Sequence, residues 1–331
     1  MEKTDVELSV LVAVYNAENF LEECLESVLS QKVGRMEIIV VNDGSKDKSQ
    51  NIIQKYLAKS VNMKVIYNQE NQGTLLTRIE ALRYARGKYV TFIDGDDSYV
   101  PFSLHNILDL AIKKDVDILE FGYHLLNVEK KEIYKHGMCH EKMPMNEVIK
   151  NKKSCFNLLE LYNLEVPLFK RFYSKRLYKR VLNYFIGFND YKLRFKNVLS
   201  EDEFITPIFF AYAKSYYYSN QKIYNYMFQN VGSITYNIKQ NTEKMIKSAE
   251  DYMFACSHIS KELRKKNLVG KLGYIQYNLN GINFFITKCV ICELPFKERV
   301  KKTIRYYSFQ DILYFYIGRY FINETMQSKK S

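Results

Sequence analysis

Short apolar runs alternate with helical stretches along the first 121 residues. Five runs of strand length are apolar, and they cover 8–14, 38–41, 64–67, 89–93 and 117–121. Between the first two runs, Leu21, Leu25 and Val28 fall on one helical face and glutamates on the other, with Asn16 placed to cap a helix from about Ala17. Strands that alternate with amphipathic helices predict a doubly wound, mostly parallel sheet with helices on both faces.

Polar residues follow several of these predicted strands at the point where each strand ends. Tyr15 and Asn16 follow the first strand, and Asp43 follows the second. The fourth strand runs into Asp94-Gly95-Asp96-Asp97, which places three carboxylates within four positions. Ligands of an open parallel sheet bind beyond the carboxyl ends of its strands, and crowded carboxylates are commonly relieved by a hard cation. The pattern therefore predicts a site for a metal and a diphosphate.

The second half of the chain has a different pattern. Residues 127–145 are polar and predict a hairpin or loop, and from Asn146 the pattern is mostly helical, with short strands expected at 216–218 and 223–226. Glu201 and Asp202 form a second acidic group in a basic region. From Glu243 onward the sequence predicts several helices, so a mainly helical C-terminal region is expected.

Charge is distributed unevenly along the 331 residues. The net charge is +12 overall, but it is −5 up to Glu120 and +17 beyond it. The six cysteines show no spacing typical of a disulfide framework, the acidic start differs from a signal peptide, and no apolar run has the length of a spanning helix. A cytoplasmic protein with reduced thiols is therefore expected.

Seven segments of the chain resemble, in the same order, motifs of the bacterial family 2 glycosyltransferases, which have the GT-A nucleotide-sugar fold. The matching segments are 9–16, 38–45, 71–73 with Arg78, 89–97, 175–180, 200–204 and 232–235. The resemblance covers about 6–235, and the last third has no comparable match. One departure is Met227, which stands where the family often has an arginine that contacts the diphosphate; Lys222 is a candidate substitute. The family's processive Gln-x-x-Arg-Trp pattern is absent because the chain has no Trp, which favours addition of a single sugar.

The resemblance implies a division of the chain and a donor site. Residues 1–122 are expected to bind the nucleotide sugar, 123–240 to complete the same GT-A domain with the acceptor site and catalytic base, and 241–331 to form a helical extension. Asp43 is placed to accept the imide N–H of uracil, and Arg78 either to pair with the diphosphate or to orient Asp94. The residues predicted to bind the nucleotide sugar are Ala13, Tyr15, Asp43, Asn71, Gly73, Arg78, Asp94 and Gly95.

The acids are expected to divide the chemistry between them. Asp96 is the predicted ligand of Mn²⁺ or Mg²⁺, and Asp94 supports the metal or binds a ribose hydroxyl. Asp97 is expected to support these ligands without binding the metal directly. By resemblance, Asp202 is the general base and Glu201 assists it or contacts the acceptor. The expected function is an inverting, metal-dependent glycosyltransferase that moves one sugar from a nucleotide sugar, of which a UDP-sugar is the expected class. The expected acceptor is a hydroxyl of a glycan or lipid-linked molecule in surface polysaccharide, lipooligosaccharide or glycoconjugate synthesis.

Simpler interpretations compete with each of these assignments. The acids 94–97 can form a loop before a helix, Glu201 and Asp202 an exposed helix start, and Arg78 a surface ion pair. The basic second half is an alternative site for nucleic acid, although no RNA-binding motif is visible. Basic and aromatic residues over 296–323 suit the surface of an anionic membrane, which would place the protein peripherally on the inner face of the plasma membrane, or they form an ordinary packed helix.

Overall fold

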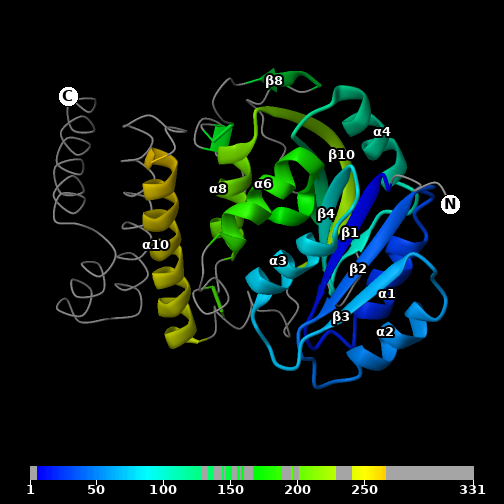
Figure 1. Ribbon diagram of the computed structural model, residues 1–331. Coiled ribbons are helices and arrows are strands. Elements are labelled where there is room, and N and C mark those ends of the chain that lie inside the picture. Colours follow the sequence, from blue (N-terminus) through cyan, green and yellow to red (C-terminus); the bar gives the residue numbers. More distant parts are fainter. Residues whose placement is uncertain are drawn as a thin grey trace. The chain divides into compact units, whose positions relative to one another are not determined.

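The computed structural model describes residues 6–127, 133–136, 144, 146–150, 155–156, 158–159, 167–187, 195–196, 201–228 and 241–265 (Figure 1). The chain divides into two compact units, Met1–Val231 and Gly232–Ser331. The described part of the second unit contains the helix α10 (Thr242–Lys265). None of the helices in these described ranges is long and apolar enough to cross a membrane. The predicted C-terminal helices past residue 265, with the segment 296–323, lie outside the described residues.

Strands and helices alternate through the first part of unit 1, as the apolar pattern predicts. The elements are β1 (Leu8–Val14), α1 (Leu21–Leu29), β2 (Met36–Asn42), α2 (Ser49–Leu57), β3 (Met63–Tyr67), α3 (Thr74–Tyr84), β4 (Tyr89–Asp94), β5 (Ser98–Tyr99) and α4 (Leu104–Lys114). Strands β3, β2, β1 and β4 lie in that order and pair in parallel. Their carboxyl ends consequently lie at one edge of the sheet.

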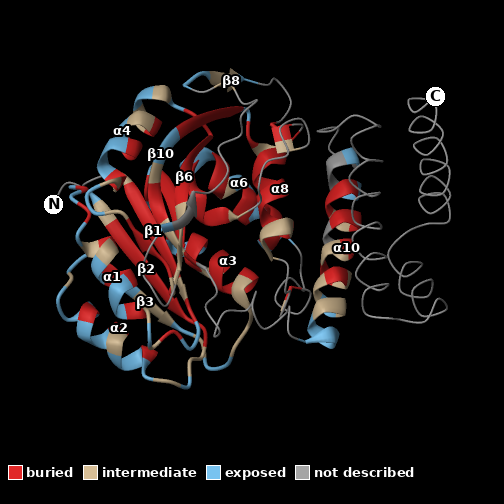
Figure 2. Cartoon of the chain, turned by 180° about the vertical axis from the view of Figure 1, so that it is seen from behind, coloured by how far each residue is buried: buried red, intermediate tan, exposed pale blue. Residues whose placement is uncertain are grey.

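Helices cover both faces of this sheet. Leu8, Val10 and Val12 of β1 join a core with buried residues of α1, α2 and α4. Helix α3 contributes none of its residues to that core and contacts β1 and β2, so it packs against the opposite face. Figure 2 shows the central strands as almost entirely buried, which explains their continuous apolar sequences.

The second part of unit 1 extends the same sheet. Its elements are β6 (Ile118–Asn127), β7 (Ile133–His136), β8 (Val148–Lys150), the 3₁₀ helix η1 (Leu168–Lys170), β9 (Arg171–Ser174), α6 (Lys175–Ile186), α8 (Glu201–Tyr212) and β10 (Ser215–Phe228). Strand β9 lies antiparallel between β4 and β6, and β10 pairs in parallel with β6. The mostly parallel α/β sheet with helices on both faces is thus confirmed. Strand β7 pairs antiparallel with β6, in agreement with a hairpin after residue 127.

Two local predictions were wrong. The expected strands at 216–218 and 223–226 are one strand, because β10 keeps its pairing with β6 across irregularities between Tyr218 and Tyr224. Asn16 does not cap α1, which begins only at Leu21. Its backbone is left-handed, with φ 49°, and its side-chain oxygen accepts the Lys46 N–H at 2.8 Å. The Asn16 side chain therefore binds the loop after β2 instead of capping the helix.

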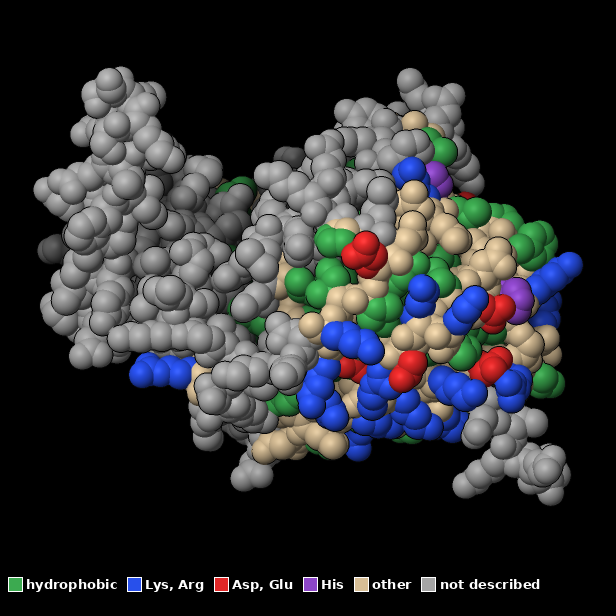
Figure 3. Space-filling view, turned by 90° about the horizontal axis from the view of Figure 1, so that it is seen from above, with side chains coloured by type: hydrophobic (Ala, Val, Ile, Leu, Met, Phe, Trp, Pro, Cys, Tyr) green, Lys and Arg blue, Asp and Glu red, His purple; other side chains and the backbone are tan. Residues whose placement is uncertain are grey.

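Positive side chains also gather on the first unit. Figure 3 shows a face on which the described Lys and Arg side chains form a broad band with fewer Asp and Glu among them. Unit 1 extends to Val231 and so includes part of the basic second half of the sequence, which agrees with this band.

Candidate functional site

Three parallel strands bring the predicted donor residues to one edge of the sheet. Ala13 of β1 lies opposite Val41 of β2 and Asp94 of β4 in the strand register. Asp43 directly follows β2, and its backbone N–H donates to the Val14 carbonyl at 2.8 Å. Asp43 and Asp94 therefore flank the end of β1 from its two sides.

The turn after β4 is packed tightly against this edge. A Cβ added to Gly95 would lie 3.3 Å from the Ala13 carbonyl oxygen and 3.3 Å from the Ala17 Cβ, so the turn approaches β1 at a distance that suits glycine. Asp96 follows at the surface of the turn and is partly exposed. Tyr15, just past the end of β1, has 47% of its surface exposed and is available to a ligand.

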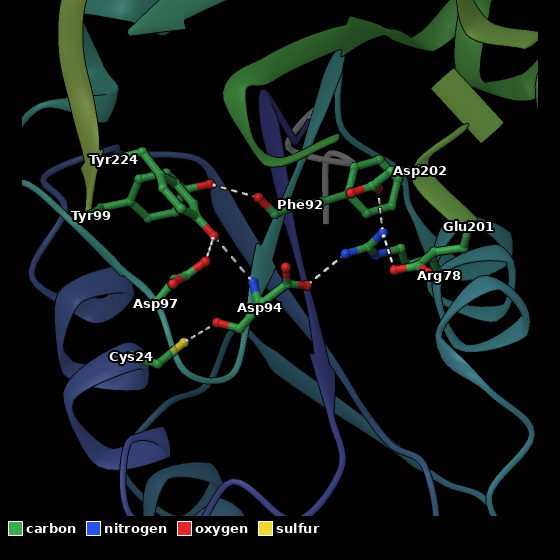
Figure 4. A network of polar contacts seen from close by, with 9 residues as sticks. All are labelled: Cys24, Arg78, Phe92, Asp94, Asp97, Tyr99, Glu201, Asp202 and Tyr224. Carbon is green, nitrogen blue, oxygen red and sulfur yellow. Dashed lines mark hydrogen bonds and ion pairs between the residues drawn. The ribbon is translucent and has the colours of Figure 1, made fainter. Parts of the chain in front are cut away.

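Arg78 of α3 joins two acidic groups that are far apart in the sequence (Figure 4). Its Nη2 lies 2.7 Å from Asp94 Oδ1, and its Nη1 lies 2.7 Å from Asp202 Oδ1 and 3.2 Å from Glu201 Oε1. The arginine side chain is only 3% exposed. This excludes the surface ion pair as an interpretation of Arg78 and places Asp94 and Asp202 on one guanidinium.

The two acids that begin α8 point toward this arginine. Their side chains are 15% exposed for Glu201 and 24% for Asp202, so they are not a fully solvated helix start. The second acidic group is consequently built into the same site as the turn after β4.

Asp97 faces inward and fastens the turn to β10. Its Oδ2 accepts the Tyr224 hydroxyl at 2.6 Å, and its Oδ1 accepts the Met227 N–H at 2.8 Å. The Tyr224 oxygen also accepts the Asp94 N–H at 3.4 Å. Sequence reasoning overlooked Tyr224 as a site residue, because its place in an aromatic strand gave no sign that its hydroxyl would meet an aspartate 127 positions away.

Met227 occupies the position at which the family often has an arginine. The side chain lines a small hollow together with Phe20, Glu23, Asp96, Asp97 and Ser98. Lys222, the candidate substitute, precedes Tyr224 on β10, and its side chain packs beside Gly122. The cation that lies among the acids in the described structure is instead Arg78.

Asp43 organises the loop between β3 and α3. Its Oδ1 accepts the Gln72 N–H at 2.9 Å and the Asn68 side-chain amide at 2.8 Å, and its Oδ2 accepts the Gly73 N–H at 2.9 Å. Asn71 lies in the loop that these bonds hold. A carboxylate has about four lone-pair positions, so one remains for the predicted uracil imide. That contact stays a prediction.

The acids at this edge fit a cation that is shared with a diphosphate. Among the residues described, no three His, Cys, Asp or Glu side chains group closely enough to hold a metal by themselves. Asp97 is committed to Tyr224 and Met227, and Asp94 to Arg78. Mg²⁺ is commonly held by one or two carboxylates together with substrate phosphates and water. The partly exposed Asp96 suits that arrangement better than a cage made entirely of protein ligands.

Comparison with known proteins agrees with this geometry. Residues 9–161, which include the strand ends and the turn 94–97, match the family model of glycosyl transferase family 2. This part of the chain is similar to the glycosyl transferases of family 2. This agrees with the sequence resemblance, which rested on motifs inside and beyond the matched range.

Individual curated relatives match different parts of the chain. Glycosyltransferase GlyA of Streptococcus pneumoniae is 28% identical over 75% of this chain and 34% of its own length. The putative teichuronic acid biosynthesis glycosyltransferase TuaG of Bacillus subtilis is 31% identical over 44% of this chain and 57% of its own length. The chain spans about a third of the length of the first curated relatives it matches.

A solved structure shows the same fold. Staphylococcus aureus TarS 1–349 in complex with UDP-GlcNAc superposes with a TM-score of 0.67 at 20% identity, covering 91% of this chain and 79% of that one. At this identity the likeness concerns the arrangement of strands and helices. It agrees with the GT-A sheet expected for a family 2 member.

Burial makes the acidic pair Glu201 and Asp202 hard to ionise completely. Desolvation raises the pKa of Glu201 to about 8, although the nearby Arg78 opposes the rise. Burial likewise raises the pKa of Asp202, against the opposing effect of Arg78. One arginine cannot neutralise three neighbouring carboxylates, so Glu201 is expected to hold a proton at neutral pH.

We expect the ligand-free protein to lose stability as the pH rises from about 4.5 to 8. In this window the folded state binds the Glu201 proton more tightly than the unfolded state does. This proton therefore contributes fully to the free energy of unfolding below pH 4.5, and the contribution is lost as the pH rises to about 8. Glu201→Gln should reduce the loss of unfolding free energy between pH 5 and 8 by about 1–3 kcal/mol. Urea denaturation across this range measures it, with Glu80→Gln on α3 as control. If the free energy of unfolding depended on pH equally in wild type and Glu201→Gln, the raised pKa of Glu201 would be contradicted.

Gly44 controls the approach of the loop that Asp43 holds. Its φ is +72°, and a Cβ there would lie 2.8 Å from the Glu70 carbonyl carbon and 2.9 Å from the Asn71 nitrogen. Gly44→Ala should lower the free energy of unfolding by about 1–3 kcal/mol, because both the backbone and the loop must shift. Gly34→Ala is the control, because nothing lies within 4 Å of its added Cβ. Equal denaturation midpoints for the two variants would show that the loop adapts freely.

Proposed function

We propose that this chain is an inverting glycosyltransferase that moves one sugar from a nucleotide sugar, of the UDP class, to a hydroxyl of a glycan or lipid-linked acceptor. The observation that carries the proposal is the contact of Arg78 with both Asp94 and Asp202. This contact supports the proposal because the candidate base Asp202 and the predicted donor residue Asp94 bind the same guanidinium. The UDP-GlcNAc bound by TarS supports a UDP-sugar donor, and the teichuronic acid named for TuaG supports a surface polysaccharide product.

The proposed reaction is a single displacement at the anomeric carbon. Asp202 accepts the proton of the acceptor hydroxyl while the acceptor oxygen forms its bond to that carbon. The bond to the diphosphate oxygen breaks at the same time, and the nucleoside diphosphate leaves with the electron pair. Attack from the face opposite the diphosphate inverts the configuration. Arg78 opposes the rise that burial causes in the pKa of Asp202, and it would hold Asp94 beside the donor.

A divalent cation fits the donor side of this proposal. Asp96 would hold Mn²⁺ or Mg²⁺ with the support of Asp94, and the cation would stabilise the charge of the departing diphosphate. The residues of the chain provide the remaining interactions. Asp43 and the loop it organises would bind the base, and Gly95 would allow the donor to approach the end of β1.

The nucleotide class and the metal requirement are tested together by thermal denaturation. Wild-type protein is heated with UDP-GlcNAc, UDP-glucose, UDP-galactose or GDP-mannose, each with and without Mn²⁺. We expect one UDP-sugar to stabilise the protein only with metal, by about 2.7 kcal/mol at one hundred times its Kd. Release of UDP from that donor then measures activity. No response to any nucleotide sugar would contradict the proposed function, and a preference for GDP-mannose would contradict its donor class.

A further inference from the structure

The turn that carries the predicted metal ligand is closed between its first and last residues. The Asp97 N–H donates to the Asp94 carbonyl at 3.1 Å, so residues 94–97 form one β-turn. Gly95 and Asp96 are its two central residues. Gly95 packs against the end of β1, and Asp96 is partly exposed. The direction of the Asp96 carboxylate therefore depends on how firmly the two ends of the turn are held.

A single hydroxyl of β10 binds both ends of this turn (Figure 4). The Tyr224 hydroxyl donates to Asp97 Oδ2 at 2.6 Å, and its oxygen accepts the Asp94 N–H at 3.4 Å. The backbone of the same strand adds a third bond, from the Met227 N–H to Asp97 Oδ1 at 2.8 Å. Residue 227 thus supports the turn through its main chain, and a methionine can do this as well as the arginine common in the family.

The Tyr224 ring is fixed by its neighbours. It is fully buried, and it stacks on Phe169 with ring centroids 4.3 Å apart and planes 12° apart. It also meets the Tyr99 ring edge-on, at 5.4 Å and 87°, where β10 pairs with β5. Because these contacts fix the ring, the hydroxyl has a defined position at the turn. A phenylalanine would fill the same space, so packing alone does not require the hydroxyl.

Tyr99 is a natural comparison for Tyr224. Both phenols are buried and their rings are in contact. The Tyr99 hydroxyl, however, donates to the Phe92 carbonyl at 3.3 Å and lies 3.1 Å from Thr91 Oγ1. These two positions belong to β4 and precede the turn. The Tyr99 hydroxyl therefore bonds to the strand, whereas the Tyr224 hydroxyl bonds to the turn.

We propose that Tyr224 is a positioning residue that presents Asp96 to the metal of the nucleotide complex by binding both ends of the turn 94–97. The inference rests on the proposed role of Asp96 as metal ligand. Tyr224 acts only through Asp94 and Asp97. Groups that hold metal ligands in place typically change metal affinity by about 10–100-fold when they are removed. Loss of the hydroxyl should therefore weaken metal binding and leave the proposed base in place.

The test compares Tyr224→Phe with Tyr99→Phe, which each remove one buried hydroxyl. Free Mn²⁺ is measured by electron paramagnetic resonance as Mn²⁺ is added to protein and UDP, so the readout does not depend on turnover. We expect the Kd of Mn²⁺ to rise about tenfold in Tyr224→Phe and to stay within about twofold in Tyr99→Phe. Equal Mn²⁺ affinities in wild type and Tyr224→Phe would overturn the proposal. Equal losses in the two variants would assign the effect to packing and would overturn it as well.

Turnover gives a second readout that a purely structural defect would not move. Release of UDP from the donor identified by thermal denaturation is measured over a range of Mn²⁺ concentrations. In Tyr224→Phe the Mn²⁺ concentration for the half-maximal rate should rise about tenfold, and excess Mn²⁺ should restore kcat to within about threefold of wild type. A lower kcat at every Mn²⁺ concentration, with an unmoved midpoint, would show a structural defect and overturn the proposal.

Another variant covers the case in which Tyr224→Phe does not fold. Phe169→Leu keeps the Tyr224 hydroxyl and an apolar neighbour but removes the ring that stacks on Tyr224. It should weaken Mn²⁺ binding in the same direction, and an unchanged Mn²⁺ affinity would overturn the proposal. Failure of the proposed function gives a different result, because wild-type protein would then bind UDP without Mn²⁺ or would not bind it at all.

Discussion

Asp202→Asn is expected to reduce sugar transfer by roughly 10²–10⁴-fold, the usual contribution of a positioned general base. The asparagine oxygen can still accept a hydrogen bond from Arg78, so the site should keep its shape. Binding of the donor, measured by titration calorimetry, should change little if Asp202 acts on the acceptor hydroxyl as proposed. The loss should therefore appear in kcat rather than in the KM of the donor.

Glu203→Gln is a matched control for this variant. Glu203 lies in the same first turn of α8, next to the two acids that Arg78 contacts. We expect it to retain activity within about threefold, since substitutions away from the reacting groups rarely change rates strongly. Equal losses of donor binding and turnover in Asp202→Asn would remove Asp202 from the role of base and assign it to the donor site.

Arg78→Met should have the largest effect on stability. The substitution leaves Asp94, Glu201 and Asp202 without their shared cation in a largely buried site. Removing one partner of a buried charge network typically costs about 3–5 kcal/mol, which urea denaturation at pH 7.5 would measure. Activity should fall below detection because neither the base nor Asp94 keeps its orientation.

The pH dependence of this variant provides an independent check. Without the arginine, the carboxylates should retain protons to a higher pH in the folded state than in the unfolded state. Lowering the pH toward 5 should then restore part of the lost stability. Arg83→Met, on the same helix but 46% exposed, should cost less than about 1 kcal/mol. Similar losses for the two variants, or no recovery at low pH, would contradict the central role of Arg78.

The sequence predicted best what depends on local patterns. Parallel strand ends bring Asp43 and Asp94 together because each strand is short, apolar and followed by a polar turn. The partner of Arg78 could not be derived in this way, since Asp202 lies 124 positions away on a helix whose approach is set by packing. The inward position of Asp97 was likewise hidden, because three neighbouring acids look equivalent until β10 supplies Tyr224.

Errors in the local prediction have equally specific causes. Asn16 suits a helix cap by residue type, but Lys46 and Ser45 from the next loop compete for its polar groups. Polar residues 219–222 suggested a break in β10, yet irregular pairing with β6 carries the strand through them. In both cases a contact between distant segments outweighed the local preference.

The place of β9 between β4 and β6 affects how the protein can be synthesised. Strand β4 emerges from the ribosome early, but the residues that pair with its outer edge, Tyr173 and Ser174, follow about 80 positions later. At typical elongation rates of about 5–20 residues per second, that edge stays open for roughly 4–16 s. During this interval the nascent chain carries an unpaired strand edge, which is a site at which another chain can pair.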